Sequence, residues 1–255
     1  MAPKYSICIT NYNTVDTIRE SLESLLNQID DSFEIIVCDN SSTDGSREIL
    51  KKYADQGKLK LVSQKDRNRG KGRQCAYEHS SGDLILACFD MDDVFKPTLR
   101  EILRKYHADH EGYMLILGGP AFIPRYLVEQ VGGWRTWPTF EDIDFANRVA
   151  SLGKVHYFPD ASPLAMRVGT RTRGVFRGLR EVYIRKQTAY ALSLSYPTIG
   201  IRPHPSWYAR RIIWFVESLA LLSCRLRRIK RHDDRTNEIE SSPHAKPDAG
   251  HSGGP

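Results

Sequence analysis

Three aspartates follow directly on an apolar run in the middle of the chain, as Asp90, Asp92 and Asp93. The run itself, Leu84–Phe89, predicts a strand that is buried on both faces of a sheet. Open α/β sheets bind their ligands at the carboxyl ends of such strands. Neighbouring carboxylates at that edge favour Mg2+ or Mn2+ completed by substrate phosphates, which suggests a nucleotide-diphosphate site. A solvated turn that caps the next helix explains the same residues, and both interpretations stay open at this stage.

Strand and helix patterns alternate over the first 160 residues. We expect strands at Tyr5–Thr10, Phe33–Asp39, Leu59–Ser63, Asp83–Phe89, Tyr113–Leu117 and Lys154–Phe158. We expect helices near Asp16–Gln28, Ser46–Gln56, Lys71–His79, Pro97–Asp109, Pro124–Val131 and Asp142–Leu152. Repeated alternation predicts an α/β fold whose mostly parallel sheet is covered by helices on both faces.

The five cysteines form no CxxC pair, and three of them fall in predicted strands. We expect them as small core residues in a reducing compartment, without disulfides or a zinc site. The amino terminus shows no basic and apolar signal pattern, because Tyr5–Ile9 already reads as a strand. Both observations favour a cytoplasmic location.

The net charge of +6 is unevenly distributed along the chain. Residues 162–231 contain fifteen Lys or Arg and two acids, a balance of +13, so the remainder carries −7. We expect a folded domain at 1–160, a basic helical extension at 161–231 and a disordered tail at 232–255. A basic segment joined to an acidic domain predicts an anionic partner surface, either membrane lipid or nucleic acid.

The stretch Trp207–Leu226 in the basic extension is apolar but is interrupted by Glu217. Ile212–Cys224 as one helix would cover about 20 Å, against roughly 30 Å of hydrocarbon in a bilayer. Its polar residues share one narrow stripe with arginines at both ends, a pattern typical of helices that lie in a membrane interface. Docking on the folded domain or on a second copy of the chain explains it equally well. The nearby tyrosines are spaced for helix packing and not for base stacking, so no nucleic acid is expected.

Polar side chains also follow the first two predicted strands and open the last predicted helix. Thr10 and Asn11 end the first strand and Asp39 ends the second, so we expect all three at the sheet edge that carries the aspartates. Glu141 and Asp142 stand where the last helix begins, and the helix dipole explains acids there. A general base that faces a substrate hydroxyl explains them as well.

Taken in order, these motifs resemble family 2 glycosyltransferases with the GT-A fold, over Lys4–Phe158 or roughly three-fifths of the chain. The resemblance is carried by Thr10–Asn13, Val37–Gly45, Asn68–Gly72 leading into Cys75-Ala76, Ser81–Asp83, Asp90–Asp93, Gly132–Trp134 and Glu141–Asp144. It implies a Rossmann-like sheet and the inverting transfer of a sugar from a nucleotide diphosphate, with Mn2+ or Mg2+ as cofactor.

The resemblance also implies roles for the matched residues. Asp90 and Asp92 would form the DxD motif that holds ribose, metal and diphosphate, and Asp142 would be the catalytic base. Contacts with the nucleotide sugar are expected from Thr10, Asn11, Asp39, Asp90, Arg69 and Glu141. Arg69 belongs to a basic cluster with Arg67, Lys71 and Arg73, for which a solvent-facing loop is the alternative explanation.

Departures from the family pattern narrow the expected reaction. Processive members carry Gln-x-x-Arg-Trp, whereas Gln187 is followed by Thr-Ala-Tyr, so we expect transfer of a single sugar. His156 is expected to be structural. A UDP-sugar is the preferred donor and a GDP-sugar the alternative, and the acceptor is expected to be a saccharide or lipid-linked saccharide at the inner face of the cell membrane. The rival is a peripheral membrane-binding protein with a degenerate transferase domain, and a homo-oligomer fits either.

Overall fold

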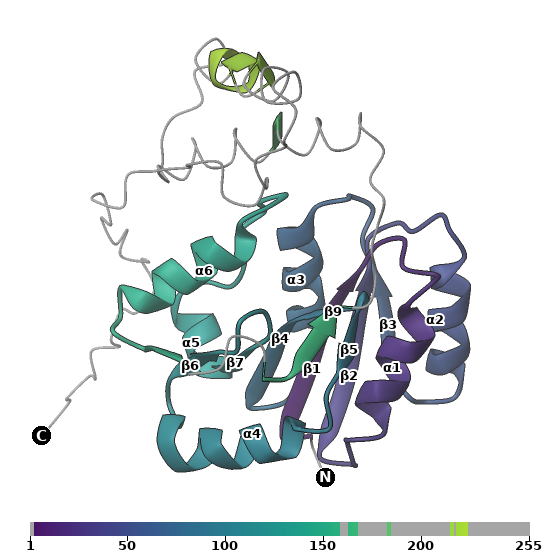
Figure 1. Ribbon diagram of the computed structural model, residues 1–255, viewed down its shortest axis with the longest axis vertical. Helices are drawn as coiled ribbons and strands as arrows, with labels where there is room; N and C mark the ends of the chain where they lie inside the picture. Colours follow the sequence, from purple (N-terminus) through teal and green to yellow (C-terminus); the bar gives the residue numbers. More distant parts are fainter. Residues whose placement is uncertain (1–2, 159–162, 168–182, 185–214, 217, 224–255) are drawn as a thin grey trace, which may run out of the picture.

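A seven-stranded sheet forms the centre of the molecule, with helices packed on both of its faces (Figure 1). The computed structural model describes residues 3–158, 163–167, 183–184, 215–216 and 218–223. The strands of this sheet are β1 (Tyr5–Asn11), β2 (Phe33–Asp39), β3 (Lys60–Ser63), β4 (Leu84–Asp90), β6 (Met114–Ile116), β7 (Ala121–Pro124) and β8 (Val155–Tyr157). The helices are α1 (Ile18–Leu26), α2 (Ser46–Asp55), α3 (Arg69–Glu78), α4 (Leu99–Lys105), the π-helical turn η1 (Tyr106–His110), α5 (Arg125–Gln130) and α6 (Glu141–Ala150).

The strand order is β3-β2-β1-β4-β7-β6-β8. Strands β3, β2, β1 and β4 run parallel to one another, and β6 is parallel to β8, whereas β7 is antiparallel to both β4 and β6. The expected mostly parallel sheet is therefore confirmed, and six of its strands were predicted. The seventh, β7, was not predicted, because its four residues follow Gly118-Gly119-Pro120 and lead straight into α5.

Alternate residues of the central strands supply two separate apolar cores. Ile7 and Ile9 of β1 join the core covered by α1, α2 and α4, while Cys8 joins the core covered by α3, α5 and α6. Figure 1 shows α1 and α2 on one side of the strands and α3, α5 and α6 on the other. Successive residues of a strand point to opposite faces of the sheet, and helices cover both faces. Every position of a central strand is therefore buried, which is why these strands are continuous apolar runs in the sequence. Cys8 and Cys38 are buried in this way, as expected of core cysteines.

A second, two-stranded sheet lies beside the sequence Asp90–Asp93. It pairs β5 (Asp93–Phe95) with β9 (Ala165–Arg167) in antiparallel register, Asp93 opposite Arg167. The backbone N–H of Lys96 donates to the carbonyl of Leu164 at 2.8 Å, and Leu164 is fully buried. The chain therefore returns after β8 to the neighbourhood of the aspartates.

Most of the predicted basic extension lies outside the described residues, including the arginines beyond Arg167 and both ends of the predicted helix 207–226. Within that helix, residues 215–216 and 218–223 are helical. Its side chains Phe215, Leu219 and Leu222 are 57, 42 and 52% exposed. Among the residues that the structure describes, no helix has the length and apolar character needed to cross a membrane.

Candidate active site

The carboxyl ends of β1, β2 and β4 bring four of the predicted site residues together. In the parallel register Asn11 lies opposite Asp39, and Thr10 lies between Cys38 and Asp90. Strands β1 and β2 are each followed by a polar loop that leads into a helix, and β4 is followed by a short turn into β5. The residues expected to line a nucleotide pocket are therefore neighbours across the sheet.

Asp39 is fully buried and is held by hydrogen bonds from the loops around it. Its Oδ1 accepts from Asn11 Nδ2 at 2.9 Å and from Ser42 Oγ at 2.6 Å, and its Oδ2 accepts from the backbone N–H of Ser42 at 3.1 Å. The guanidinium of Arg47 lies 3.6 Å from Oδ2. These donors hold the carboxylate in place at the strand end and fix the direction in which its remaining lone pairs point.

Asp44 joins the loops after β1 and β2 and does not cap α2 from the N-cap position. Its Oδ2 accepts from the N–H of Val15 at 2.9 Å, and its Oδ1 accepts from the N–H and hydroxyl of Ser46. The N-cap residue of α2 is Gly45, whose φ of 94° is one that glycine adopts at little cost. Asp44 thus connects the loop that follows β2 to the loop that follows β1.

Strand β4 contains a bulge directly before the predicted metal ligands. Its register with β1 shifts between Ile7 and Ile9, and Cys88 at this point has φ of 61°. A bulge redirects the side chains that follow it, and a non-glycine residue in this conformation is strained. The strained residue therefore sets the direction of Asp90.

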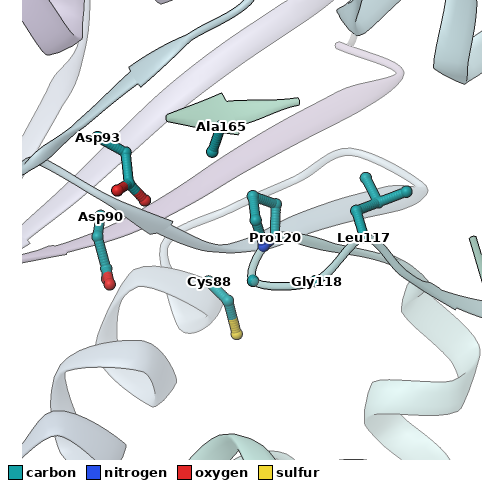
Figure 2. A pocket seen from close by; sticks show the side chains of 8 residues that line it. Cys88, Asp90, Asp93, Leu117, Gly118, Pro120 and Ala165 are labelled. Carbon is teal, nitrogen blue, oxygen red and sulfur yellow. The ribbon is translucent and has the colours of Figure 1, made fainter. Parts of the chain in front are cut away.

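A cavity of about 230 Å³ opens beside Asp90. The described residues that line it are Cys88, Asp90, Asp93, Leu117, Gly118, Gly119, Pro120 and Ala165. Figure 2 shows Asp90 and Asp93 at one end of it. Asp93 was not among the predicted site residues. Its position beside Asp90 and Asp92 in the sequence could have indicated that it belongs to the site. Asp92 lies between them in sequence and is half-buried.

The described carboxylates fit a partly open metal site. No three His, Cys, Asp or Glu side chains converge among the described residues. Mg2+ and Mn2+ do not require a complete protein cage, because they are commonly held by one or two carboxylates plus the phosphates of a substrate. The side chain of Asp90 is 37% exposed at the cavity and presents such an oxygen ligand. The chemistry of the residues is therefore compatible with the expected cofactor.

Helix α6 begins with Glu141 and Asp142, the second of which is the predicted catalytic base. Glu141 is fully buried at its first position, where Oε1 accepts from Arg73 Nε at 2.9 Å. Arg69 is half-exposed, with Nε 3.9 Å from the same oxygen. Asp142 is exposed at the next position and its charge is felt at Cys88 and Arg73. Arg73 therefore joins Glu141 to Asp90, and the charge of Asp142 acts on Arg73 as well.

The thiol of Cys88 responds to these charges. Burial raises its pKa to about 12; the guanidinium of Arg73 opposes the shift, and the carboxylates of Asp142, Glu141 and Asp90 add to it. A thiol with this pKa is protonated at neutral pH, so Cys88 is not a nucleophile here. The site therefore offers carboxylate chemistry.

The basic cluster on α3 separates into different roles. Asn68 caps the helix by accepting from the N–H of Lys71 at 2.9 Å, and Lys71 pairs with Asp66. A Cβ on Gly70 would lie 2.1 Å from the carbonyl oxygen of Arg135, so this glycine permits close contact with the loop before α6. A solvent-facing loop does not explain Arg73, which is buried.

Comparison with known proteins identifies the chain. Residues 6–151, more than half of its length, match the family model described as glycosyl transferase family 2. The chain belongs to this family. Among curated relatives it is 37% identical over 93 residues to the Escherichia coli protein named UDP-Glc:alpha-D-GlcNAc-diphosphoundecaprenol beta-1,3-glucosyltransferase WfaP, covering 36% of this chain and 37% of WfaP. It is 33% identical over 118 residues to the poly(ribitol-phosphate) beta-N-acetylglucosaminyltransferase TarS of Staphylococcus aureus, covering 44% of this chain and 20% of TarS.

Solved structures of low sequence identity share the fold of this family 2 glycosyltransferase. The mannosyltransferase PcManGT of Pyrobaculum calidifontis, solved with GDP-Man and Mn2+, superposes with a TM-score of 0.62 at 19% identity, over 89% of this chain and 76% of PcManGT. Residues 1–349 of TarS, solved with UDP-GlcNAc, give 0.58 at 18% identity, over 76% of this chain and 68% of that one. The expected GT-A fold is confirmed. The chain spans less than two-fifths of the length of the curated relatives WfaP and TarS.

Proposed function

We propose that the protein is a metal-dependent inverting glycosyltransferase that moves one sugar from a nucleotide-diphosphate sugar to an acceptor hydroxyl. The observation that carries the proposal is the meeting of three elements. The ends of β2 and β4 bear Asp39 and Asp90, and the start of α6 bears Glu141 and Asp142. Asp90 lines the cavity, and Arg73 links it to Glu141, which stands directly before the candidate base.

The residues divide into a donor side and an acceptor side. Asp39, with Thr10 and Asn11 beside it, binds the base and ribose of the donor. Asp90 and Asp92 hold Mn2+ or Mg2+, which when bound offsets negative charge on the leaving diphosphate. Arg69 borders the sugar, and the buried Glu141, predicted to contact it as well, lies 3.9 Å behind the guanidinium of Arg69.

Asp142 carries out the acid–base chemistry. Its carboxylate accepts the proton of the acceptor hydroxyl, whose oxygen attacks the anomeric carbon opposite the leaving group. The bond from that carbon to the diphosphate oxygen breaks and takes its electron pair to the nucleoside diphosphate. One displacement of this kind inverts the anomeric configuration and requires no nucleophilic side chain.

The donor is a UDP-sugar in this proposal. The name of WfaP states a UDP-Glc donor, and TarS was solved with UDP-GlcNAc. A GDP-sugar is the second candidate, because PcManGT was solved with GDP-Man. Binding and hydrolysis measured with UDP-sugars and with GDP-sugars distinguish the two candidate donors.

The acceptor is a lipid-linked saccharide at the inner face of the cell membrane. The acceptor in the name of WfaP is linked to diphosphoundecaprenol. In this chain the helical residues 215–216 and 218–223 expose Phe215, Leu219 and Leu222, spaced to lie along one helix face, in a region whose sequence is rich in arginine. Such a face suits peripheral contact with anionic lipid. Co-sedimentation with phosphatidylcholine vesicles, with and without phosphatidylglycerol, tests this membrane contact. We expect the wild-type protein to bind the anionic vesicles and Leu219→Asp to abolish that binding.

The central experiment measures binding and hydrolysis of UDP-, GDP- and dTDP-sugars with Mn2+ and with EDTA, beside Asp92→Ala. Metal-dependent turnover of one donor, lost in Asp92→Ala, is the expected result. Asp31→Ala is the matched control, since this exposed aspartate lies before β2 at the opposite edge of the sheet. Absence of binding to every donor with metal present would refute the proposal.

A further inference from the structure

Arg73 is a buried cation that links the strand of the proposed metal ligands to the helix of the proposed base. It belongs to α3, and its side chain is 5% exposed. Its Nε donates to Glu141 Oε1 at 2.9 Å, and its Nη2 lies 3.9 Å from Asp90 Oδ1. Glu141 precedes Asp142 in α6, and Asp90 ends β4. One guanidinium thus touches the carboxylates of two elements that belong to opposite halves of the site.

The cost of this arrangement argues for a role beyond stability. Burial alone lowers the pKa of Arg73, yet the net shift is upward, and the carboxylates of Glu141, Asp90 and Asp142 all favour the charged guanidinium. Buried ion pairs of this kind seldom stabilise a fold more than apolar residues of the same volume do. The guanidinium of Arg73 therefore stays charged although it is buried. Apolar residues of the same volume would pack there without the free-energy cost of burying a charge.

The contact between Arg73 and Glu141 is also incomplete. Arginine and carboxylate groups that pair for strength commonly form two parallel hydrogen bonds. Here Arg73 Nη1 and Glu141 Oε2 are both buried and have no hydrogen-bond partner among the described residues. The guanidinium makes one contact with Glu141 and one with Asp90, and it forms two parallel hydrogen bonds with neither.

We propose that Arg73 is a positioning residue, which sets the placement of Asp142 relative to the metal-binding end of β4. The inference rests on the proposed function and adds to it a residue outside the ligand contacts. Arg73 is buried and acts through Glu141 and Asp90, without touching the substrate. Because a cation 3.9 Å from Asp90 repels Mn2+, its removal does not weaken metal binding. Its loss instead lets α6 and the base shift.

Two measurements on Arg73→Met separate positioning from packing. We expect kcat to fall by about 100-fold, the order of loss caused by a misplacement of about 1 Å. We expect the Kd of UDP in the presence of Mn2+, measured by calorimetry, to be unchanged or lower. Arg73→Lys keeps the charge but cannot reach both carboxylates, so its kcat should be intermediate with full UDP binding. If Arg73→Met does not fold, Arg73→Lys carries the test.

Arg148→Met is the matched control. Arg148 also forms a largely buried ion pair on α6, with Asp144 at 3.0 Å, and donates to the carbonyls of Val131 and Gly133. Its loss should lower the melting temperature and leave kcat near the wild-type value. The inference is overturned if kcat of the Arg73 variants stays at that of the control, or if kcat and UDP affinity fall in parallel. Failure of the proposed function looks different, because the wild-type protein would then bind no UDP with Mn2+.

Discussion

The side chains of Asn11 and Asp39 share a hydrogen bond of 2.9 Å across two parallel strands. The amide of Asn11 donates, and the carboxylate of Asp39 accepts on the oxygen that also receives the hydroxyl of Ser42. A carboxylate placed by three donors and buried at a strand end is prepared to receive further donors from a ligand. In the proposed function, the orientation of this carboxylate is therefore set before the nucleotide binds.

Replacement of Asp39 by Asn should weaken nucleotide binding. The new amide accepts on one side only, so it loses either the bonds from Asn11 and the Ser42 hydroxyl or the bond from the Ser42 N–H, and hydrogen bonds to a charged group are worth about 1.5–3 kcal/mol. The Kd of UDP with Mn2+, measured by calorimetry, should therefore rise by roughly 10-fold to 100-fold. Asp44→Asn is the control in the same loop, and it should lower stability more than affinity. Wild-type affinity in Asp39→Asn would contradict the assignment.

Replacement of Asp142 by Asn should remove catalysis and preserve donor binding. The residue is exposed at the start of α6, and a positioned general base contributes about 10²–10⁴-fold to a rate. Steady-state assays at saturating donor and acceptor should show kcat lower by that factor, with the Kd of UDP unchanged. Asn147→Ala, at an exposed position of the same helix, should behave like the wild type. A normal kcat in Asp142→Asn would assign the base elsewhere.

The sequence predicts those parts of the fold that depend on local pattern. The central strands were found because each is a short apolar run that ends in polar residues, and Asp39 and Asp90 were placed at one edge for the same reason. Strand β7 depends on antiparallel pairing with β4, which no local pattern records. The three-residue strands β5 and β9 likewise exist only through their contact with one another.

The burial of Arg73 could not be predicted either, because it stands among charged and glycine residues that look solvated. Only the structure shows that Gly70 and Gly72 bring α3 against the loop before α6 and against Asn40. The strain at Cys88 is equally hidden, since its sequence position continues an apolar run. Both features arise from long-range packing around the site.

The left-handed conformation of Cys88 should cost measurable stability. A residue with a Cβ pays roughly 1–2 kcal/mol in this conformation, whereas glycine does not. Cys88→Gly should therefore be more stable than Cys88→Ala by about 1 kcal/mol, as measured by urea unfolding. The pair compares two variants that both lack the thiol, so the thiol's own packing cancels. Equal stability of the two would show that the bulge relaxes when the side chain is removed.

The carboxylate of Glu34 should give the fold part of its sensitivity to acid. Burial raises its pKa, but hydrogen bonds from the hydroxyl of Ser6 and from Ser81 and Gly82 outweigh it, and the net pKa is below the ordinary 4.5. The folded state then binds the proton less readily than the unfolded chain. The stabilisation is complete above about pH 4.5 and is lost as the pH falls through the lower, folded pKa.

Glu34→Gln should therefore be less stable than the wild type at neutral pH, and the two free energies of unfolding should converge as the pH falls below 4.5. Urea unfolding at successive pH values measures both curves. Glu48→Gln, at an exposed position of α2, is the control and should follow the wild type. Parallel curves for Glu34→Gln and wild type would mean that the bonds joining β1, β2 and the start of β4 do not depend on the charge of Glu34.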